Sequence, residues 1–295
     1  MIQVFYSPSY VGTGYDFDTN RKAKWVADSL LEAPIEGASL AEPAPLTPDQ
    51  LALVHDGDYV RAIRTGTPRE LAESQGFTWD PQVWRMALAT NGGVVAAATS
   101  ALEHGAAGSL SSGLHHARRG AGEGFCTFNG LAIAAKVALA ARAKCVLILD
   151  LDAHFGGGTQ SLVAGDSRIW HVDVSVNDFD QYPPSERAWS CLVRDSSDYL
   201  PTVERRLNEL EQYAPRFDLC LYNAGMDPHE HCPMGGLVGI TRDTLEQRER
   251  MVFDWCRRNR LPVAFALAGG YIGRRLDERG LVDLHRLTIV SAARP

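Results

Sequence analysis

The chain has 295 residues, of which 45% are hydrophobic and 22% are charged, and its formal net charge is −7. This composition excludes a disordered chain, a collagen-like repeat and a highly charged tail protein. The acidic balance also lacks the clustered basic surface that nucleic acids require, so we expect no nucleic-acid partner.

The N-terminal sequence and the cysteines bear on cellular location. Met1–Tyr6 shows no basic segment followed by a long apolar one, so we expect no signal peptide. Lys136 interrupts the most apolar stretch, and no run approaches the roughly 18 residues of a membrane span. The six cysteines include no C-x-x-C pair, which favours reduced thiols over disulfides or a thiolate zinc cluster. We therefore expect a cytoplasmic protein with no membrane partner.

Short β-rich or apolar segments alternate with longer helical ones along the chain. The expected strands are Ile2–Tyr6, Cys145–Leu151, Ile169–Val176, Leu219–Asn223 and Pro262–Leu267. The expected helices are Asn129–Arg142, Thr202–Tyr213 and Thr241–Asn259, with Asn129 and Thr241 as N-caps. We expect the small, polar segment Gly105–Gly113 to be a loop. The alternation predicts an α/β fold, a parallel sheet wrapped by helices, in a single domain over residues 1–295.

The most informative segment lies where the apolar strand Cys145–Leu151 ends. Asp150, Asp152 and His154 stand two residues apart, so in an extended chain they project to the same side. Three glycines follow, and the carboxyl end of a parallel strand is where α/β sheets bind ligands. This pattern favours a metal site over a strand that merely ends in polar loop residues.

Two ligands leave a divalent ion incomplete, so another acid from a different strand is needed. Asp227 follows such an apolar strand. Two carboxylates and one imidazole suit zinc and leave coordination positions open for water and substrate. His229 and His231 are rival ligands from the same loop.

Hydrolysis also needs groups that move protons. The adjacent His115 and His116 lie in a glycine-flanked loop, and an imidazole titrates near neutrality, so it can accept and return a proton. Tyr271 follows Gly269 and Gly270 at the end of another apolar run. From spacing alone, the favoured reading of this last signal is a strand-ending turn followed by an ordinary exposed tyrosine.

Together these segments resemble the histone deacetylase family, which includes bacterial deacetylases and acetylpolyamine amidohydrolases. The resemblance rests on five motifs in family order and on the helix-like segment Val54–Val60. The motifs are Gly113-Leu114-His115-His116-Ala117, Gly124-Phe125-Cys126-Thr127-Phe128-Asn129, Asp150-Leu151-Asp152-Ala153-His154, Ala224-Gly225-Met226-Asp227 and Gly269-Gly270-Tyr271.

The resemblance implies the arginase–deacetylase fold, a central parallel sheet with helices on both faces. It implies one Zn²⁺ per chain. The implied zinc ligands are Asp152, His154 and Asp227. In the family pattern His116 is the main proton acceptor, His115 is its electrostatic partner oriented by Asp150, and the Tyr271 hydroxyl stabilises the oxyanion.

The resemblance also implies a substrate tunnel and a second ion. Gly124, Phe125 and Tyr182 correspond to the tunnel positions, between which an unbranched acyl-amine chain would fit. A structural monovalent cation, K⁺ in the family, would be bound at Asp150, Ser175 and the carbonyls of Asp152 and His154.

The sequence departs from the family at several positions. Phe155, Gly156 and Gly157 stand where the family usually has histidine, glycine and an asparagine or aspartate. Gly157 therefore lacks the side chain that would orient His116, and we expect the basicity of His116 to differ. Cys232 replaces an aspartate before Pro233, and residues 18–22 replace an early proline-rich signature.

These observations predict a zinc-dependent amidohydrolase that acts on an acetylated amine, such as acetyl-lysine or an acetylpolyamine. One alternative is a ureohydrolase with two manganese ions, although Gly156 stands where that motif needs an aspartate. Another is a catalytically silent module that binds acyl-amines, which would have no need of His116 and Tyr271. The sequence leaves the oligomeric state open.

Overall fold

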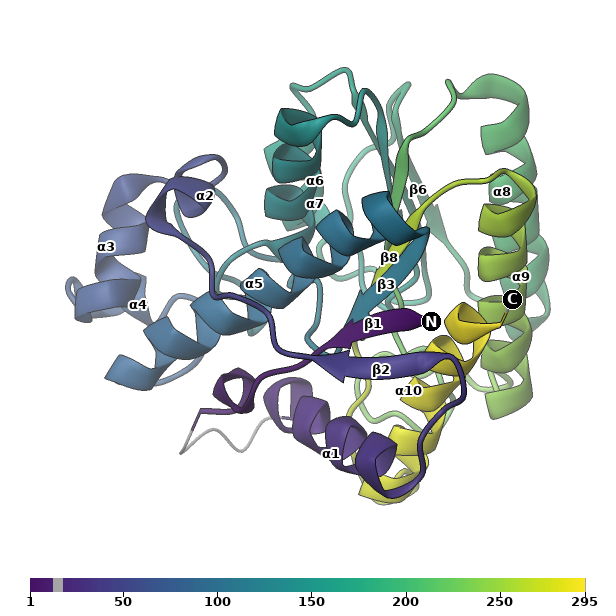
Figure 1. Cartoon of the computed structure of the whole chain (residues 1–295), viewed down its shortest axis with the longest axis horizontal. Coiled ribbons are helices and arrows are strands. Elements are labelled where there is room, and N and C mark those ends of the chain that lie inside the picture. The colour runs from purple at the N-terminus through teal and green to yellow at the C-terminus, as the bar shows by residue number, and fades with distance from the viewer. Residues whose placement is uncertain (13–17, 295) are drawn as a thin grey trace.

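The structure is a computed structural model that describes residues 1–12 and 18–294. Its centre is one eight-stranded sheet in the order β2-β1-β3-β8-β7-β4-β5-β6, and every pairing of its strands is parallel (Figure 1). The strands are β1 (Ile2–Phe5), β2 (Ala38–Ala41), β3 (Ala106–Ser109), β4 (Val146–Asp150), β5 (Ile169–Ser175), β6 (Ala188–Leu192), β7 (Leu219–Asn223) and β8 (Val263–Ala266).

Helices cover both faces of this sheet. They are α1 (Asp18–Glu32), α2 (Pro48–Ala52), α3 (Gly57–Thr65), α4 (Arg69–Ala72), α5 (Pro81–His104), α6 (Gly130–Ala141), α7 (Gly157–Val163), α8 (Tyr199–Tyr213), α9 (Arg242–Arg258) and α10 (Glu278–Ala293), with short 3-10 turns η1 (Pro8–Tyr10) and η2 (Ser196–Asp198). This arrangement confirms the predicted α/β fold class.

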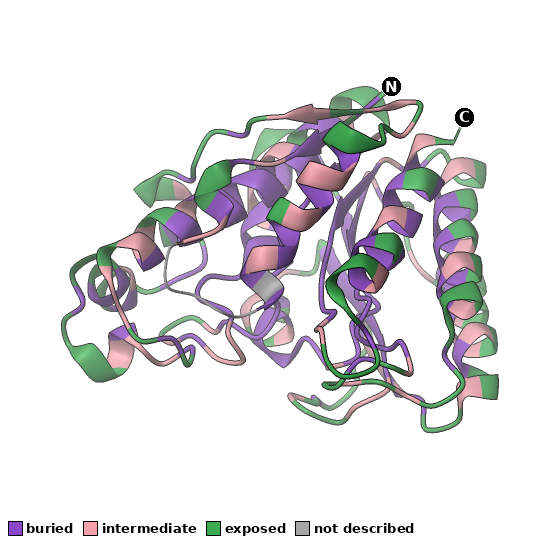
Figure 2. Cartoon of the chain, turned by 90° about the horizontal axis from the view of Figure 1, so that it is seen from below, coloured by how far each residue is buried: buried purple, intermediate pink, exposed green. Residues whose placement is uncertain are grey.

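The sheet separates two apolar cores, because successive side chains of a strand point to opposite faces. Leu147 and Leu149 of β4 join the core covered by α1, α8, α9 and α10, whereas Val146 and Ile148 join the core covered by α3, α5 and α6. Figure 2 shows the buried strands between these two layers of helices. The helices thereby fix β4 and its neighbours, whose carboxyl ends carry the predicted site.

Most of the predicted elements are confirmed. The expected strands correspond to β1, β4, β5, β7 and β8, and the expected helices correspond to α6, α8 and α9. Asn129 Oδ1 accepts a hydrogen bond from Ala132 N at 3.0 Å, and Thr241 Oγ1 accepts one from Thr244 N at 3.3 Å, so both predicted N-caps are formed.

The prediction of a loop over Gly105–Gly113 is wrong, because β3 occupies the centre of that segment. Its sequence, Ala-Ala-Gly-Ser, has no large apolar side chain and therefore none of the composition that marks a strand. The side chains of β3 are small because of how the strand packs. Gly108 is the register partner of Phe265 on β8, and a Cβ at Gly108 would overlap the Phe265 ring.

A fully buried ion pair on α9 anchors the segment that follows β4. Arg248 Nη2 donates to Glu249 Oε1 at 2.6 Å, and Arg248 Nη1 donates to the carbonyl of Leu151 at 3.2 Å. Tyr222 on β7 donates to the same Glu249 oxygen at 2.7 Å. Arg248 and Glu249 have no measurable exposure. This network therefore ties α9 to the ends of both strands that lead into the predicted site.

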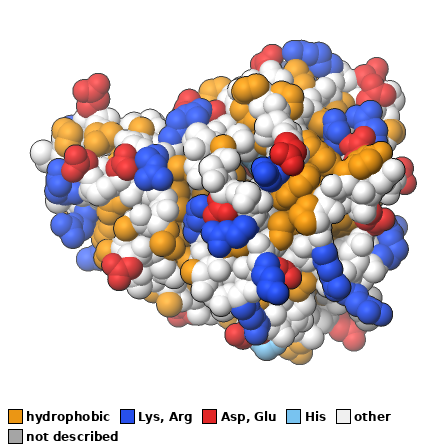
Figure 3. All heavy atoms as spheres, turned by 90° about the horizontal axis from the view of Figure 1, so that it is seen from above, with side chains coloured by type: hydrophobic (Ala, Val, Ile, Leu, Met, Phe, Trp, Pro, Cys, Tyr) orange, Lys and Arg blue, Asp and Glu red, His pale blue; other side chains and the backbone are white. Residues whose placement is uncertain are grey.

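Two surface observations complete the fold. Among the helices of the described residues, none is long and apolar enough to cross a membrane. On the face drawn in Figure 3, basic and acidic side chains are interspersed rather than separated into blocks.

We predict that Gly108→Ala destabilises the fold by about 1–3 kcal/mol, because its methyl group would have to displace the Phe265 ring inside a packed core. Urea denaturation would measure the change. Gly165→Ala is the matched control, since a Cβ there meets no atom within 4 Å. Equal stability of the two variants would contradict this prediction, because it would show that β3 and Phe265 accommodate the methyl group without cost.

We predict that Arg248→Met costs about 3–5 kcal/mol of unfolding free energy, because it leaves the Glu249 charge buried without its partner. The double variant Arg248→Met/Glu249→Met removes both charges and should be more stable than Arg248→Met alone. Denaturant titrations of both variants test this. A double variant less stable than the single one would contradict a dominant role for the unpaired charge.

Candidate metal centre

The two segments that carry the predicted metal ligands leave neighbouring strands at the same edge of the sheet. β4 ends at Asp150 and β7 ends at Asn223, and these two residues are register partners. The loops beyond them come very close, since a Cβ at Gly225 would lie 2.5 Å from Asp152 Cα. A glycine at position 225 thus lets Asp227 reach Asp152.

The three predicted ligands converge. His154 Nδ1 lies 3.1 Å from Asp152 Oδ1 and 3.2 Å from Asp227 Oδ2, and one ligand atom from each residue lies within 4.8 Å of the others. Asp152 and Asp227 are buried, and the His154 side chain is 15% exposed. One side of the cluster therefore stays open to incoming molecules.

The spacing of these atoms fits a zinc ion. Zinc bonds of about 2.0–2.1 Å in a tetrahedral arrangement place neighbouring ligand atoms about 3.3–3.4 Å apart. The two measured distances from His154 are close to that value. Asp227 Oδ2 is buried and makes no hydrogen bond with the described residues, as expected of an oxygen reserved for a metal.

The electrostatics of the cluster also favour a bound cation. Burial, together with the Asp152 carboxylate, raises the pKa of Asp227 to about 6. Burial lowers the pKa of His154, but the carboxylates of Asp152 and Asp227 outweigh burial and raise that pKa to about 10. The two carboxylates thus hold a proton on His154 in the absence of a metal, and a metal ion would replace it.

The two adjacent histidines lie beside this cluster as one hydrogen-bonded pair. His115 Nδ1 lies 2.8 Å from Asp150 Oδ2, and His115 Nε2 lies 3.1 Å from His116 Nε2. Asn223 Nδ2 donates to the other Asp150 oxygen at 2.9 Å and fixes its orientation. Asp150 is therefore placed to hold the ring of His115, as the sequence analysis expected.

The two rings differ in charge. Burial opposes a charge on His115, but the carboxylates of Asp150 and Asp152 outweigh burial and raise the pKa of His115 to about 10. Burial and the charge on His115 lower the pKa of His116 to about 4, although Asp180 opposes them. His116 is thus neutral near pH 7, the state in which an imidazole can accept a proton.

His116 has a carboxylate partner that the sequence analysis missed. His116 Nδ1 lies 2.9 Å from Asp180 Oδ2, in the loop between β5 and β6. The same oxygen accepts a hydrogen bond from Gly158 N at 3.0 Å, and Asp180 Oδ1 accepts one from Arg118 Nη2. Asp180 has a left-handed backbone with φ of +58°, which aspartate tolerates better than most residues.

This contact corrects the expectation for Gly157. The side chain at position 157 is indeed missing, but a Cβ there would overlap Asp180 Oδ1. The glycine therefore makes room for the carboxylate of another loop, and His116 keeps an acidic partner. Asp180 belongs to no motif, and the only signal in the sequence was the gap at Gly157 itself.

Aromatic rings border the His154 side of the cluster. The Phe179 ring centroid lies 5.0 Å from that of His116 and 6.1 Å from that of His154, and Phe179 is 44% exposed. Gly124 lies against His116, since a Cβ there would come within 2.5 Å of His116 Cδ2, and Phe125 follows it. Gly124 thus lies beside His116, whereas the ring of Phe125 packs against Phe77, with the ring centroids 5.5 Å apart.

The structure does not bring Tyr182 to this wall. Tyr182 is buried, its ring stacks on His171 at 5.3 Å, and its hydroxyl lies 3.2 Å from His171 Nδ1. Phe179, three residues earlier in the loop, has the ring contacts with the histidines instead. The chain turns between the two residues, so Tyr182, the ring that the family resemblance implied for the tunnel, is buried and Phe179 is exposed.

The β8 loop and α1 close the site from behind. Gly269 lies against Asp227, and Tyr271 follows two residues later. Lys22 of α1 is completely buried and donates a hydrogen bond to the Gly269 carbonyl. Burial lowers the pKa of Lys22 to about 8, and Asp227 and Asp152 oppose that shift. Lys22, in the segment that departs from the family signature, thus reaches the wall of the site.

The remaining predicted residues lie near the cluster without joining it. Ser175 Oγ donates to Asp173 Oδ1 at 2.6 Å, at the end of the strand next to β4. His229 Nδ1 accepts a hydrogen bond from His231 N at 3.2 Å, and the ring centroids of these two histidines are 5.3 Å apart. Neither rival ligand belongs to the group of Asp152, His154 and Asp227.

Comparisons with known proteins find a matching family model and similar sequences. A family model described as the histone deacetylase domain matches residues 17–280. An uncharacterized protein of Picosynechococcus is 36% identical over 242 residues, which cover 77% of this chain and 77% of that protein. Histone deacetylase 2 of Arabidopsis thaliana is 27% identical over 296 residues, covering 92% of this chain and 75% of that protein.

A solved structure shares the fold. The crystal structure of an acetylpolyamine aminohydrolase from Burkholderia pseudomallei superposes with a TM-score of 0.81 at 20% sequence identity, and the alignment covers 100% of both chains. At that identity the likeness establishes the architecture of the sheet and its helices.

Proposed function

Since this chain belongs to the histone deacetylase family, we propose that it is a zinc-dependent hydrolase of acylated amines, with residues 1–295 as one catalytic domain. The observation that carries the proposal is the convergence of Asp152, His154 and Asp227 beside the hydrogen-bonded histidine pair. A metal site beside a neutral, oriented imidazole provides the two elements that amide hydrolysis needs.

Asp152, His154 and Asp227 would hold the zinc ion. When bound, zinc would polarise an acyl carbonyl and activate a water molecule. The chain's own contribution is the placement of these ligands. Asp227 Oδ1 accepts a hydrogen bond from Ala153 N at 3.0 Å, and Asp152 Oδ1 accepts one from His154 N at 3.1 Å, so each carboxylate keeps its orientation.

His116 is the proposed proton carrier. Its low pKa leaves Nε2 unprotonated near pH 7, with His115 Nε2 as its hydrogen-bond donor at 3.1 Å. When the attacking water replaces His115 as that donor, Nε2 would accept the proton of the water and later return it to the departing amine. His115, held by Asp150, carries positive charge beside it. That charge would stabilise the negative charge that develops on the acyl group.

Asp180 is the proposed positioning residue for His116. By accepting from His116 Nδ1, its carboxylate fixes the ring so that Nε2 faces the cluster and selects the tautomer protonated at Nδ1. Arg118 holds Asp180 in turn. Asp180, a loop residue, thus takes the role of orienting His116, which Gly157 cannot perform because it has no side chain.

We assign the oxyanion contact to the Tyr271 hydroxyl, a role in which a single donor is typically worth about 3 kcal/mol of transition-state stabilisation. Support comes from its place directly after Gly269 and Gly270, the turn that lies behind Asp227. The alternative of a silent binding module gives Tyr271 no role.

For the substrate we propose an unbranched acyl-amine, such as acetyl-lysine or an acetylpolyamine, that passes between aromatic rings. Gly124, Phe125 and Phe179 would form the walls, with Phe179 in the place first given to Tyr182. The net charge of −7 mildly favours a cationic amine over an anionic one.

We also propose a structural K⁺ at Asp150, Ser175 and the carbonyls of Asp152 and His154. Asp150 and Ser175 lie at the ends of neighbouring strands, which supports the assignment. The cation would share Ser175 Oγ with Asp173 Oδ1.

We predict that the purified protein releases acetate from at least one member of a panel of acetyl-lysine peptides, acetylputrescine and acetylspermidine. Dialysis against a chelator should abolish the activity, and Zn²⁺ should restore it, because Asp152, His154 and Asp227 need the ion. Asp227→Asn should stay inactive after zinc is added, whereas Asp178→Asn, an exposed residue paired with Arg194, should keep full activity. A zinc-loaded wild type that is inert to the whole panel would refute the proposed reaction.

We predict that Asp180→Asn lowers kcat by about 10–100-fold and leaves KM within about 2-fold, because the ring of His116 loses its orienting acceptor while the substrate walls stay intact. Steady-state kinetics would measure both constants, with Asp178→Asn, from the same loop, as the control. A loss confined to KM would mean that Asp180 shapes the entrance instead of positioning His116.

A further inference from the structure

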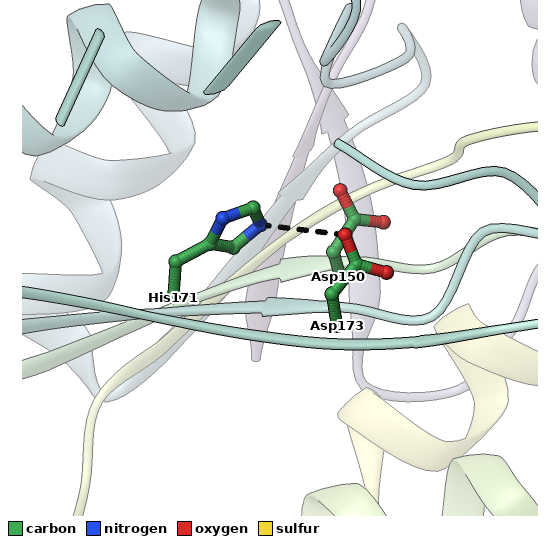
Figure 4. Close-up of side chains that lie close together, drawn as sticks. All are labelled: Asp150, His171 and Asp173. Carbon is green, nitrogen blue, oxygen red and sulfur yellow. Dashed lines mark ion pairs between the residues drawn. The ribbon is translucent and has the colours of Figure 1, made fainter. Parts of the chain in front are cut away.

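Two groups of buried polar side chains lie near the candidate metal centre. One is formed by Asp150 on β4 and by His171 and Asp173 on β5, and in Figure 4 the imidazole faces the two carboxylates. The structural cation proposed above accounts for these carboxylates. The other group is formed by Asp18 and Lys22 of α1, which are 7% and 0% exposed, and the proposed reaction gives neither of them a role.

Asp18 and Lys22 lie four residues apart, so they share one face of α1. This helix packs against α10 (Figure 1). The segment that connects β8 to α10 carries Tyr271, and we call its residues 269–272 the tyrosine turn. The shared face of α1 is therefore within reach of the tyrosine turn.

The two side chains hold the tyrosine turn on both sides of Tyr271. Ile272 N, one residue after the tyrosine, donates a hydrogen bond to Asp18 Oδ2 at 2.6 Å. The Gly269 carbonyl, two residues before the tyrosine, accepts a hydrogen bond from Lys22 Nζ. One helix thus holds the backbone before and after the proposed oxyanion donor.

The tyrosine turn depends on such contacts because its own backbone is permissive. Gly269 and Gly270 have φ of +47° and +88°, left-handed values that glycine adopts without steric cost. Before the turn, Ala268 N donates to the Ala224 carbonyl at 3.1 Å, which continues the pairing of β8 with β7. Beyond that point, the contacts with α1 supply a constraint that the glycines do not.

Both carboxylate oxygens of Asp18 are engaged. Oδ1 lies 2.8 Å from Arg21 Nη2, and Oδ2 accepts the Ile272 N–H. An acid in the first turn of a helix also stabilises the positive end of the helix dipole, and that effect needs no specific partner. The hydrogen bond to Ile272 instead fixes one oxygen at one backbone group, which is what positioning requires.

We propose that Asp18 is a positioning residue for Tyr271. By holding Ile272 N, it fixes the tyrosine turn where Gly269 lies against Asp227. A donor stabilises an oxyanion at about 2.7–3.1 Å from it, so a small shift of the turn would lower the rate. The inference rests on the proposed function, in which the Tyr271 hydroxyl is that donor.

The kinetic test is a double-variant cycle on the zinc-loaded, full-length chain. Tyr271→Phe should lower kcat by about 100-fold, and Asp18→Ala should lower it by about 10-fold with KM within about 2-fold. In the Tyr271→Phe background, Asp18→Ala should change kcat by less than about 2-fold, because it acts through the missing hydroxyl. Losses that multiply in the double variant would overturn the proposal.

Two further variants sharpen this cycle. Asp18→Asn keeps an oxygen acceptor for the Ile272 N–H and should stay within about 3-fold of the wild-type kcat. Asp28→Asn is the matched control, since it removes an acid that pairs with Lys24 on the same helix, and it should match the wild type.

Trypsin digestion gives a readout that needs no activity. Arg274 and Arg275 follow the tyrosine turn and are exposed, so cleavage there reports how firmly the turn is held. Asp18→Ala should raise the rate of this cleavage by about 5-fold, measured by mass spectrometry of the fragments. Lys22→Met, which removes the other contact, should also raise it, whereas Asp28→Asn should be cut at the wild-type rate.

The two readouts separate failure of this inference from failure of the proposed function. An active enzyme in which Asp18→Ala leaves the cleavage rate unchanged would refute the positioning role and leave the proposed hydrolysis standing. A wild type inert toward every acylated amine would refute the hydrolysis and the catalytic consequence of Asp18. Faster cleavage of Asp18→Ala would even then show that Asp18 holds the turn.

Discussion

Four carboxylates are buried at the carboxyl ends of adjacent strands, and the rest of the site follows from that constraint. Asp150, Asp152, Asp173 and Asp227 are each at most 3% exposed. Burial of an unpaired charge costs several kcal/mol, so such a group requires cations close by. The chain supplies Lys22 and the imidazoles of His115 and His154, and these are shared among the acids. A bound metal ion would meet the rest of this requirement, and the proposed chemistry depends on it.

Holding these acids together requires a rigid framework, which the two apolar cores and the α9 ion pair provide. Arg248 donates to the Leu151 carbonyl, between two of the acids, and Tyr222 connects β7 to the same network. Gly225 lets the loops meet where any side chain would collide with Asp152. A parallel sheet brings the strand ends to one edge, and these contacts then set the positions of the ligands within that edge.

Functional residues that directly follow a strand could be predicted from the sequence. Functional residues that reach the site through contacts between loops could not. Asp152, His154 and Asp227 could be predicted to converge because parallel strands end at a common edge. The strand β3 could not be predicted, because its residues have low strand propensity. They are small because the Phe265 ring packs against them. Asp180, Phe179 and Lys22 reach the site from loops or helices whose contacts leave no periodic pattern. The side chain of Tyr182, which the family resemblance implied for the tunnel, is buried and stacked on His171.

The pair of Gly157 and Asp180 shows why a missing motif residue need not mean a missing function. A side chain at position 157 and the carboxylate of Asp180 would occupy the same space, so the chain can have only one of them. His116 Nδ1 requires an acceptor, but the acceptor can come from either loop, since only the position of the oxygen matters to the ring. Moving the carboxylate to the β5–β6 loop places it next to Phe179, which contacts the same histidine. The orientation of His116 and the proposed wall of the substrate tunnel then depend on one loop, so any motion of that loop affects both.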